Sequence, residues 1–388
     1  MIYLDYNATT PLCAAAWSAM QPYFEKKFGN PSSVHAAGRE TRAAVDDARD
    51  RLAALLGAKP HEIIFTSGGT ESNNLALLGL ARRNAPHGKH LISNRAEHHA
   101  VLHALQHLEK QEGFAITWLE ISSEGLIDPD QLENAIRSDT TLVSIMTANN
   151  ETGVIQPMAE ISARCRKRGV LLHSDMVQSF GKLAADLTGV DAASFGAHKF
   201  CGPKGAGFLY LRSGLPIDRI QFGGAHEGER RPGTENVPAI VGMASAAADV
   251  LPTLPNEQAR QALLRDDLRR GIEEIFHAAQ PNGTGAPRLA NTLNVSFRGF
   301  SSETLLMALD LEGVCASSGS ACMVGSVVAS HVLLAMGMPP ERAASAVRFS
   351  LGKETSARDI VETVAAVGRI LQRAGAGAVE NQKRHAFV

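Results

Sequence analysis

The sequence lacks an excess of charge of either sign. Its 388 residues contain 38 Lys and Arg against 40 Asp and Glu, which gives a net charge of -2 and a pI near 6.7. A basic surface of the kind that nucleic-acid binding requires is therefore not indicated. The N-terminus, MIYLDYNATTPL, has no basic segment followed by an apolar run, and we find no stretch of about eighteen apolar residues that could span a bilayer. We expect no nucleic-acid or membrane partner and a cytoplasmic location.

Cysteine is also scarce. The five cysteines are an odd number, they are scattered, and no C-x-x-C pair occurs, which argues against a disulfide framework, a zinc ribbon or a thioredoxin-like motif. Each cysteine is then either buried filler or a reactive thiol. A G-x-G-x-x-G motif after the first predicted strand is missing too, which disfavours a dinucleotide-binding oxidoreductase.

Short apolar runs alternate with amphipathic helical segments between about residues 60 and 215. This alternation predicts an α/β fold with a mostly parallel sheet that is covered by helices on both faces. Such sheets bind ligands at the carboxyl ends of their strands. The predicted strands are HEIIFTSGG, KHLISN, FAITWLEI, TLVSIMTANN, VLLHSD, AASFGAHKF and GAGFLYL, and the helices between them are TESNNLALLGLARRN, HHAVLHALQHLEKQ and MAEISARCRKRG.

The length and the 44% hydrophobic content suffice for one large domain and one smaller domain, each with its own core. A helical stretch at about 235–280 is followed by NTLNVSFRG, LLMALDLEGV and AVRFSLG, with helices between and after them, which indicates an α+β domain. We predict a large domain over 16–250 and a small domain formed by 1–15 and 251–375. The small and polar residues of 376–388 predict a mobile tail.

Three features of the predicted large domain fit a single cofactor. The strand that ends near Phe65 is followed by Ser67-Gly68-Gly69-Thr70-Glu71 and a helix, where Gly69 and Thr70 could hold a phosphate, although the same pattern is also an ordinary helix cap. Asp175 ends a buried strand and needs a cationic or solvated surrounding. Lys199 follows the next strand beside a glycine-rich turn, where a lysine could form a Schiff base. Each feature alone has a structural explanation, but together they suit pyridoxal 5'-phosphate.

Eight motifs in order along the chain resemble the NifS/IscS type of cysteine desulfurase, a family of fold-type I pyridoxal-phosphate enzymes. The similarity extends from Tyr3-Leu4-Asp5 to about Glu354. It implies a fold-type I transferase with a mostly parallel seven-stranded sheet and a smaller α+β domain. The motifs are TSGGTESNN, AEHHAVL, ANNETGVIQP, SDMVQSFGK, SFGAHKFCGPKG, RRPGTENVP, SSGSAC and AVRFSLG.

The resemblance implies a role for each matching residue around the cofactor ring. Lys199 is similar to the lysine that forms the Schiff base, and Asp175 to the partner of the ring nitrogen. Gln178 matches the donor to the ring hydroxyl. His98 matches the histidine that stacks on the ring and serves as an acid or base. Asn150 matches a residue that contacts both the cofactor and the substrate carboxylate.

The resemblance also implies the phosphate and substrate ligands. The phosphate would be held by Thr70 with the Gly69 backbone, by His198, and by Thr234 of the neighbouring subunit, so that a homodimer with shared active sites follows. Arg348 matches the arginine that binds the carboxylate of L-cysteine through two parallel hydrogen bonds.

Cys322 is predicted to be the reactive cysteine. Its surroundings, CASSGSACMVGSVVASHV, are rich in small residues and predict a flexible loop, whereas Cys13, Cys165, Cys201 and Cys315 are interpreted as buried filler. The family chemistry implies that Cys322 accepts sulfur from L-cysteine as a persulfide and passes it to an acceptor or to an iron-sulfur scaffold protein. No resident metal is expected, although Cys322 could briefly ligate a cluster shared with that scaffold.

Three departures from the family pattern bear on cofactor affinity. Gly196 stands at a position near the phosphate where the family usually has a serine, and Met176 is a bulkier residue than is usual beside the ring. The stretch His226-Glu227-Gly228-Glu229, ahead of Thr234, also differs. An aminotransferase, a selenocysteine lyase and a pyridoxal-phosphate-binding scaffold without activity remain as alternatives. The acceptor, and the preference for sulfur or selenium, stay open.

Overall fold

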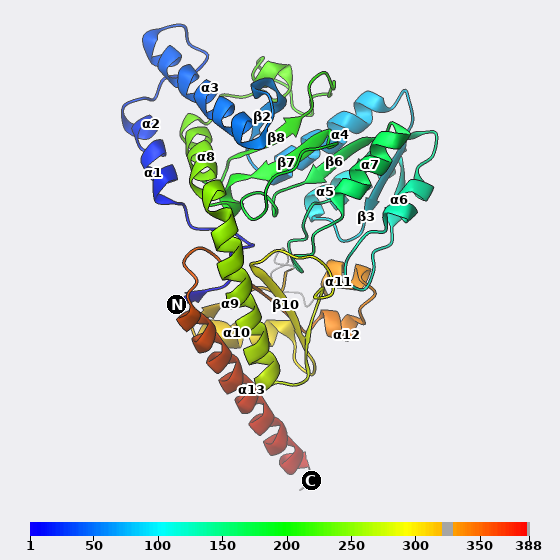
Figure 1. Ribbon diagram of the computed structural model, residues 1–388, viewed down its shortest axis with the longest axis vertical. Helices are drawn as coiled ribbons and strands as arrows, with labels where there is room; N and C mark the ends of the chain where they lie inside the picture. Colours follow the sequence, from blue (N-terminus) through cyan, green and yellow to red (C-terminus); the bar gives the residue numbers. More distant parts are fainter. Residues whose placement is uncertain (320–328, 386–388) are drawn as a thin grey trace. The chain divides into compact units, whose positions relative to one another are not determined.

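The computed structural model describes residues 1–319 and 329–385, which divide into two compact units (Figure 1). The large unit consists of 9–149 and 154–255, and the small unit of 1–8, 150–153 and 256–388. The predicted boundaries differ from these, because they assigned 9–15 and 251–255 to the small domain and 150–153 to the large one. Residues 9–15 belong to the large unit because Thr10 and Cys13 donate backbone hydrogen bonds of 2.9 Å to His198 and Cys201.

A mixed seven-stranded sheet forms the centre of the large unit, in the order β2-β8-β7-β6-β5-β3-β4. Strand β8 runs antiparallel to both of its neighbours, and the remaining pairs are parallel. All seven predicted strands are present, and the edge strand β4 is the least buried of them. Their bounds are β2 Ile63–Thr66, β3 His90–Asn94, β4 Ala115–Leu119, β5 Thr140–Ser144, β6 Leu171–Asp175, β7 Ala192–Gly196 and β8 Gly207–Leu211.

Helices cover both faces of this sheet, as adjacent strand residues show. Ile63 packs into a cluster with residues of α3, α7 and α8, whereas Ile64 packs into a second cluster with α4 and α5. Leu91 and Ile92 divide between the same two clusters, because successive side chains of a strand point to opposite faces. The helices are α1 Ala14–Met20, α2 Pro22–Glu25, α3 Ala36–Leu56, α4 Gly69–Asn84, α5 His99–Glu112, α6 Pro129–Ala135, α7 Met158–Arg168 and α8 Val237–Val250, with 3-10 turns η1 Pro60–Glu62, η2 Ala197–Lys199, η3 Glu227–Glu229 and η4 Leu251–Thr253.

One helical run is long and apolar enough to cross a membrane by length and composition, which the sequence survey did not recognise. It spans Val237–Ile275, and half of its most apolar window is buried inside the protein. Much of that apolarity belongs to α8, which packs against α1 and α3 (Figure 1). Burial of this kind is what the core helix of a folded domain shows, so the run gives no independent support for a membrane span.

The small unit contains two separate sheets, with strand orders β1-β11 and β12-β10-β9. Leu268, Val295 and Phe349 are among the residues of its core. The segment LLMALDLEGV is mostly the helix α10 and only then the strand β11, and 376–385, which were predicted to be a mobile tail, continue the helix α13. Ala376, Glu380 and Lys383 are good helix formers, which accounts for this continuation. The bounds are β1 Ile2–Tyr3, α9 Leu254–Ile275, β9 Ala279–Pro281, β10 Thr292–Phe297, α10 Ser302–Leu311, β11 Val314–Cys315, α11 His331–Ala335, α12 Pro340–Ala343, β12 Ala346–Ser350 and α13 Ala357–His385.

Candidate active site

The predicted phosphate loop joins β2 to the N-terminus of α4. Helix α4 begins at Gly69, and Thr70 is exposed in its first turn. A Cβ atom on Gly69 would lie 2.5 Å from Cγ2 of Val177, so only glycine fits against this side chain. Glu71 accepts a hydrogen bond of 2.7 Å from the Ser67 amide, which fixes the loop. The loop therefore presents helix N–H groups at a surface that suits an anion.

Asp175 is the last residue of β6 and is 5% exposed. Its carboxylate accepts hydrogen bonds from Nδ2 of Asn73 at 2.7 Å and from the Val177 amide at 2.9 Å. Within the described residues it forms no ion pair with a cation. A buried carboxylate held only by neutral donors is suited to a cationic ligand group such as a pyridinium nitrogen. Asn73, which lies in TESNN, was not singled out from the sequence.

Lys199 is the last residue of η2, which follows β7 directly. Because β6 and β7 are paired and parallel, Asp175 and Lys199 lie toward the same edge of the sheet. Burial, and then the charges of Lys199, Lys204 and Lys182, lower the pKa of His198 to about 4. Three ammonium groups acting on one neutral imidazole indicate a positive local potential, which favours an anion such as phosphate.

The N-terminal segment holds this lysine turn in place. Nδ1 of His198 lies 3.2 Å from Oγ1 of Thr9, and the carbonyl of His198 accepts hydrogen bonds of 2.9 Å from both the amide and the hydroxyl of Thr10. The Thr10 hydroxyl in turn accepts a hydrogen bond of 2.9 Å from the Cys201 amide. These two threonines position the turn, and the sequence signal for them was the NATT run near the N-terminus.

His98 and Gln178, two further residues that are expected at the ring, also lie in the large unit. His98 is the N-cap of α5, and its Nδ1 accepts a hydrogen bond from the Ala100 amide at 3.1 Å. Gln178 is 6% exposed, and its Oε1 accepts a hydrogen bond of 2.5 Å from Lys182. Glu97 is fully buried next to His98, and burial followed by repulsion from Asp175 raises the pKa of its carboxyl group to about 8. No sequence pattern indicated a protonated carboxyl group at this position.

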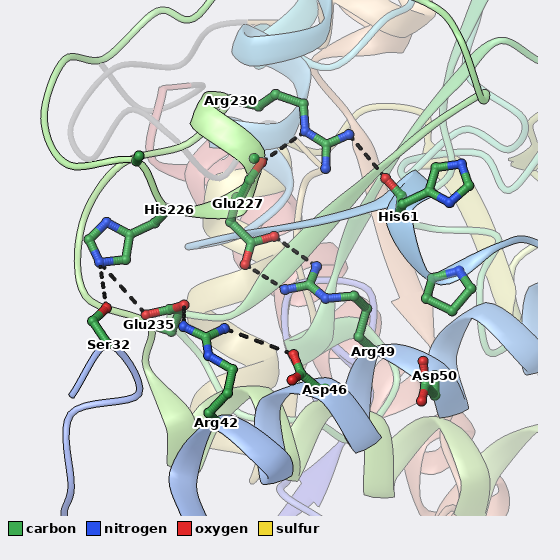
Figure 2. Close-up of a pocket in the computed structure, with 13 residues that line it drawn as sticks. Ser32, Arg42, Asp46, Arg49, Asp50, His61, His226, Glu227, Arg230 and Glu235 are labelled. Carbon is green, nitrogen blue, oxygen red and sulfur yellow. Dashed lines mark hydrogen bonds and ion pairs between the residues drawn. The ribbon is translucent and has the colours of Figure 1, made fainter. Parts of the chain in front are cut away.

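Thr234 lies on a segment that partly buried ion pairs attach to the rest of the large unit. Residues 225–228, Arg230 and Glu235 line a cavity of about 770 Å³. Figure 2 shows its lining, where Arg42 binds Glu235 and Arg49 binds Glu227 through two parallel hydrogen bonds. Arg231 binds Glu71 of the phosphate loop at 2.7 Å. Thr234 itself is exposed. The segment is thus anchored on both sides of a threonine that faces outward.

Arg348 and Asn150 lie in the small unit. Arg348 lies on β12, is 3% exposed, and donates hydrogen bonds to Oδ1 of Asp5 at 2.6 Å and to the carbonyl of Asn150 at 2.9 Å. Its Nε is buried without an acceptor. Asp5 supplies the counter-charge of this buried guanidinium, and the remaining Nε donor suits a carboxylate ligand such as the one that the resemblance implies. The other predicted cofactor residues lie in the large unit.

The structure shows the surroundings of Met176 and Gly196, two positions where the sequence departs from the family pattern. Met176 is buried in the hydrophobic core, so that its neighbour Val177 is the side chain that borders both Gly69 and Gly196. A Cβ atom on Gly196 would lie 3.4 Å from the Gly69 amide nitrogen, which is an ordinary contact. Gly196 therefore leaves room at the phosphate loop that a serine could fill.

The cysteines other than Cys322 were expected to be buried, and for three of them this prediction is wrong. Of the four cysteines that the structure describes, Cys165 is buried, and burial raises its pKa to about 12, whereas Cys13, Cys201 and Cys315 are partly exposed. Cys13 caps α1 through its sulfur, and Cys201 takes a left-handed backbone conformation with φ of 63°. Cys322 lies outside the described residues. Among the residues that are described, no group of three or more His, Cys, Asp or Glu side chains is arranged to hold a metal ion.

Comparison with known proteins places this chain in a family. Residues 2–362 match the aminotransferase class-V family. The cysteine desulfurase IscS of Dictyoglomus turgidum is 46% identical over 96% of this chain and 95% of its own length. A solved structure described as a NifS-like protein has a TM-score of 0.90 and 36% identity, covering 96% of this chain and 99% of its own. A second structure, SspA in complex with cysteine, has a TM-score of 0.80 and 34% identity, covering 90% and 99%.

The chain belongs to the class-V aminotransferase family of fold-type I pyridoxal-phosphate enzymes. Within that family, its full-length relatives include cysteine desulfurases of the IscS and NifS type. The residues fit the cofactor, because the large unit offers an amine on Lys199, a buried carboxylate on Asp175 without a cationic partner, and a glycine-rich loop in a positive surrounding at His198.

Proposed function

We propose that this enzyme, a pyridoxal-phosphate-dependent cysteine desulfurase, takes the sulfur of L-cysteine as a persulfide on Cys322 and releases L-alanine. The observation that carries the proposal is the full-length similarity to cysteine desulfurases, at 46% identity over 96% of the chain. The placement of Asp175 and Lys199 at one edge of the sheet supports it. The finer assignment of roles to residues is part of the proposal.

Each residue has a task that follows from its chemistry. Arg348 binds the substrate carboxylate, and Asn150 orients it. When bound, the cofactor supplies an electron sink that makes the Cα hydrogen of the substrate acidic. Lys199 anchors the cofactor and carries that proton, and Asp175 keeps a positive charge on the ring nitrogen. Gln178 donates to the ring hydroxyl.

The sulfur transfer requires a thiolate at Cys322. The thiolate attacks the substrate sulfur, the S–S bond forms, and the Cβ–S bond breaks with its electron pair returning to carbon, which takes up a proton to give alanine. A cysteine of ordinary pKa, about 8.5, is only a few per cent ionised at neutral pH, so a base must assist. His98 is the candidate, because its side chain lies at the N-cap of α5 in the wall that also contains Thr70.

A homodimer is part of the proposal. Thr234 is exposed on a firmly anchored segment, which suits a residue that reaches the phosphate of a partner subunit. Large apolar side chains are exposed on the same unit, and burial of such side chains against a second copy would remove apolar surface from water. These side chains are Trp17, Phe24, Phe28, Val34 and Phe222.

The product sulfur is proposed to pass to an acceptor protein for iron-sulfur cluster assembly or another sulfur-transfer pathway. The relatives include proteins named IscS and a structural neighbour named DndA, so the proposal leaves more than one acceptor pathway open. Cys322 would ligate a nascent cluster only briefly, together with a scaffold protein. We also propose a cytoplasmic location, for which the support is the sequence alone.

Substitution of Cys322 by serine tests the proposal. The variant should bind the cofactor and L-cysteine as the wild type does, since Lys199, Asp175 and Arg348 are intact. Mass spectrometry of the wild type after L-cysteine treatment should show one added sulfur, about 32 Da, on the Cys322 peptide. The serine variant should show no such mass. The label on Cys315 or Cys201 instead, or full sulfide release by the variant, would contradict the assignment.

A further inference from the structure

Helix α5 carries a histidine stripe that the proposed chemistry does not use. His99, His103 and His107 recur every four residues, which places them along one side of the helix. The opposite side is occupied by Val101, Leu105 and other buried residues that face the core. The histidine side is turned toward Thr70 and Asn74 of α4.

The stripe borders a cavity of about 500 Å³ between α4 and α5. Histidines form part of the cavity wall, and two of them, His103 and His107, are exposed. Nδ2 of Asn74 donates a hydrogen bond of 2.8 Å to the Thr70 carbonyl, which ties the α4 wall together. The exposure of His103 and His107, and the partial exposure of His99, leave these side chains accessible to solvent and small ions.

The spacing of two of these rings matches a bidentate metal site. The ring centroids of His99 and His103 are 5.1 Å apart. Two imidazoles bound to one tetrahedral ion, with Zn–N distances of about 2.0–2.1 Å, have centroids about 5 Å apart. Histidines at i and i+4 of a helix are an established arrangement for binding Zn²⁺, and imidazole also suits Ni²⁺ and Cu²⁺.

The neighbouring histidines fit less well. The rings of His98 and His99 are 6.3 Å apart, and Nδ1 of His98 caps the helix at Ala100. Nε2 of His107 lies 3.2 Å from Oε1 of Glu112, a carboxylate that Arg82 also binds. The geometry points to His99 and His103 as the protein ligands of a divalent transition-metal ion, and we propose that this pair binds Zn²⁺, with water completing the coordination.

A site with two protein ligands is consistent with the rest of the molecule. No group of three or more suitable side chains occurs within 1–319 and 329–385, so the ion would be exchangeable and not a structural part of the fold. Thr70 and His98 form part of the same wall, so an ion bound here lies in the cavity that these two proposed active-site residues line.

Equilibrium binding of Zn²⁺ to the resting holoenzyme tests this inference. The chain should carry no histidine tag and should have Cys322→Ser in every arm, because an accessible thiol also binds Zn²⁺. L-Cysteine is left out for the same reason, which makes the readout independent of desulfurase activity. Isothermal titration calorimetry should show one Zn²⁺ bound per chain in addition to any weaker sites.

The variants separate the proposed pair from its neighbours. His103→Ala and His103→Gln should each weaken this site at least tenfold, as should His99→Ala, while His107→Ala should change it less than twofold. Absorbance of the bound cofactor and the melting temperature serve as checks that the variants are folded. Absence of Zn²⁺ binding by the parent, unchanged binding by the folded His103 variants, or loss of the site in His107→Ala would each overturn the proposal.

Discussion

Arg348 donates a hydrogen bond of 2.6 Å from Nη2 to Oδ1 of Asp5, although the two residues lie 343 positions apart in the sequence. The pair gives a nearly fully buried guanidinium the counter-charge that it needs when no substrate is present. Nη1 is engaged by the Asn150 carbonyl, so the geometry of the guanidinium is fixed before a substrate arrives. This relationship leads to a prediction about substrate affinity.

Arg348→Lys should raise the KM for L-cysteine about ten- to a hundredfold, because an ammonium group keeps the charge but cannot form two parallel hydrogen bonds with a carboxylate. The value of kcat should change less, since the reacting atoms are held by other residues. Steady-state kinetics checks the split. Arg342→Lys is a matched control, because Arg342 binds Asn282 in the same unit at 2.7 Å and has no proposed substrate contact. Equal effects in both variants would contradict the role.

Two glycines beside Val177 should respond in opposite ways to an added side chain. Gly196→Ser should tighten cofactor binding about tenfold, since the Cβ has room and the hydroxyl can donate to a charged phosphate. Gly69→Ala should weaken it, because its Cβ would lie 2.5 Å from Val177 Cγ2. Titration of the apoenzyme with pyridoxal phosphate measures both. A serine at position 196 that leaves the affinity unchanged would show that its hydroxyl does not reach the phosphate.

The buried Glu97 should make stability depend on pH. Burial raises its folded-state pKa to about 8 from an ordinary 4.5, so the folded protein holds a proton that the unfolded chain has lost. Its contribution to the free energy of unfolding is full below pH 4.5 and falls by about 1.4 kcal/mol per pH unit up to about pH 8.

Glu97→Gln removes this titration, so the melting temperature of the variant relative to wild type should rise between pH 6 and 8 and level off above that. Calorimetry at a fixed scan rate provides the measurement. Glu71→Gln is the control: Glu71 is bound by Arg231 and has a lowered pKa, so its difference from wild type should stay constant over pH 6–9. A constant difference for Glu97→Gln as well would mean that this carboxyl group is ionised in the folded protein.

A mixture of two inactive chains should recover activity if the active sites are shared. When Lys199→Ala and Thr234→Ala chains form a heterodimer, a Thr234 that serves the partner's phosphate places both defects in one site and leaves the other intact. Random reassortment then yields about a quarter of wild-type activity, from half of the dimers with one working site each. The assay is run at limiting pyridoxal phosphate. If the mixture is no more active than the average of its parents, each Thr234 serves its own chain.

The sequence by itself determined the sheet and the class of chemistry. All seven strands were predicted because each is a short apolar run ending in turn residues, and a pattern of this kind is local. The sequence also singled out Lys199, Asp175 and the Gly69-Thr70 loop as candidate site residues, since parallel strands bring their carboxyl ends to one edge. The order of strands and helices along the chain was sufficient for these expectations, and the order of the eight motifs was sufficient to recognise the family.

Only the tertiary structure decided which side chains meet. The pairing of Arg348 with Asp5, the hydrogen bond from Asn73 to Asp175 and the threonines that hold the His198 turn join positions distant in the sequence, and no local pattern encodes such contacts. The raised pKa of Glu97 depends on burial, which packing sets. The spacing of the histidines of α5 can be read from the sequence. The cavity that they line with residues of α4 depends on how the two helices pack. Local periodicity fixes the elements, whereas the ionisation and partners of a side chain depend on what the fold places around it.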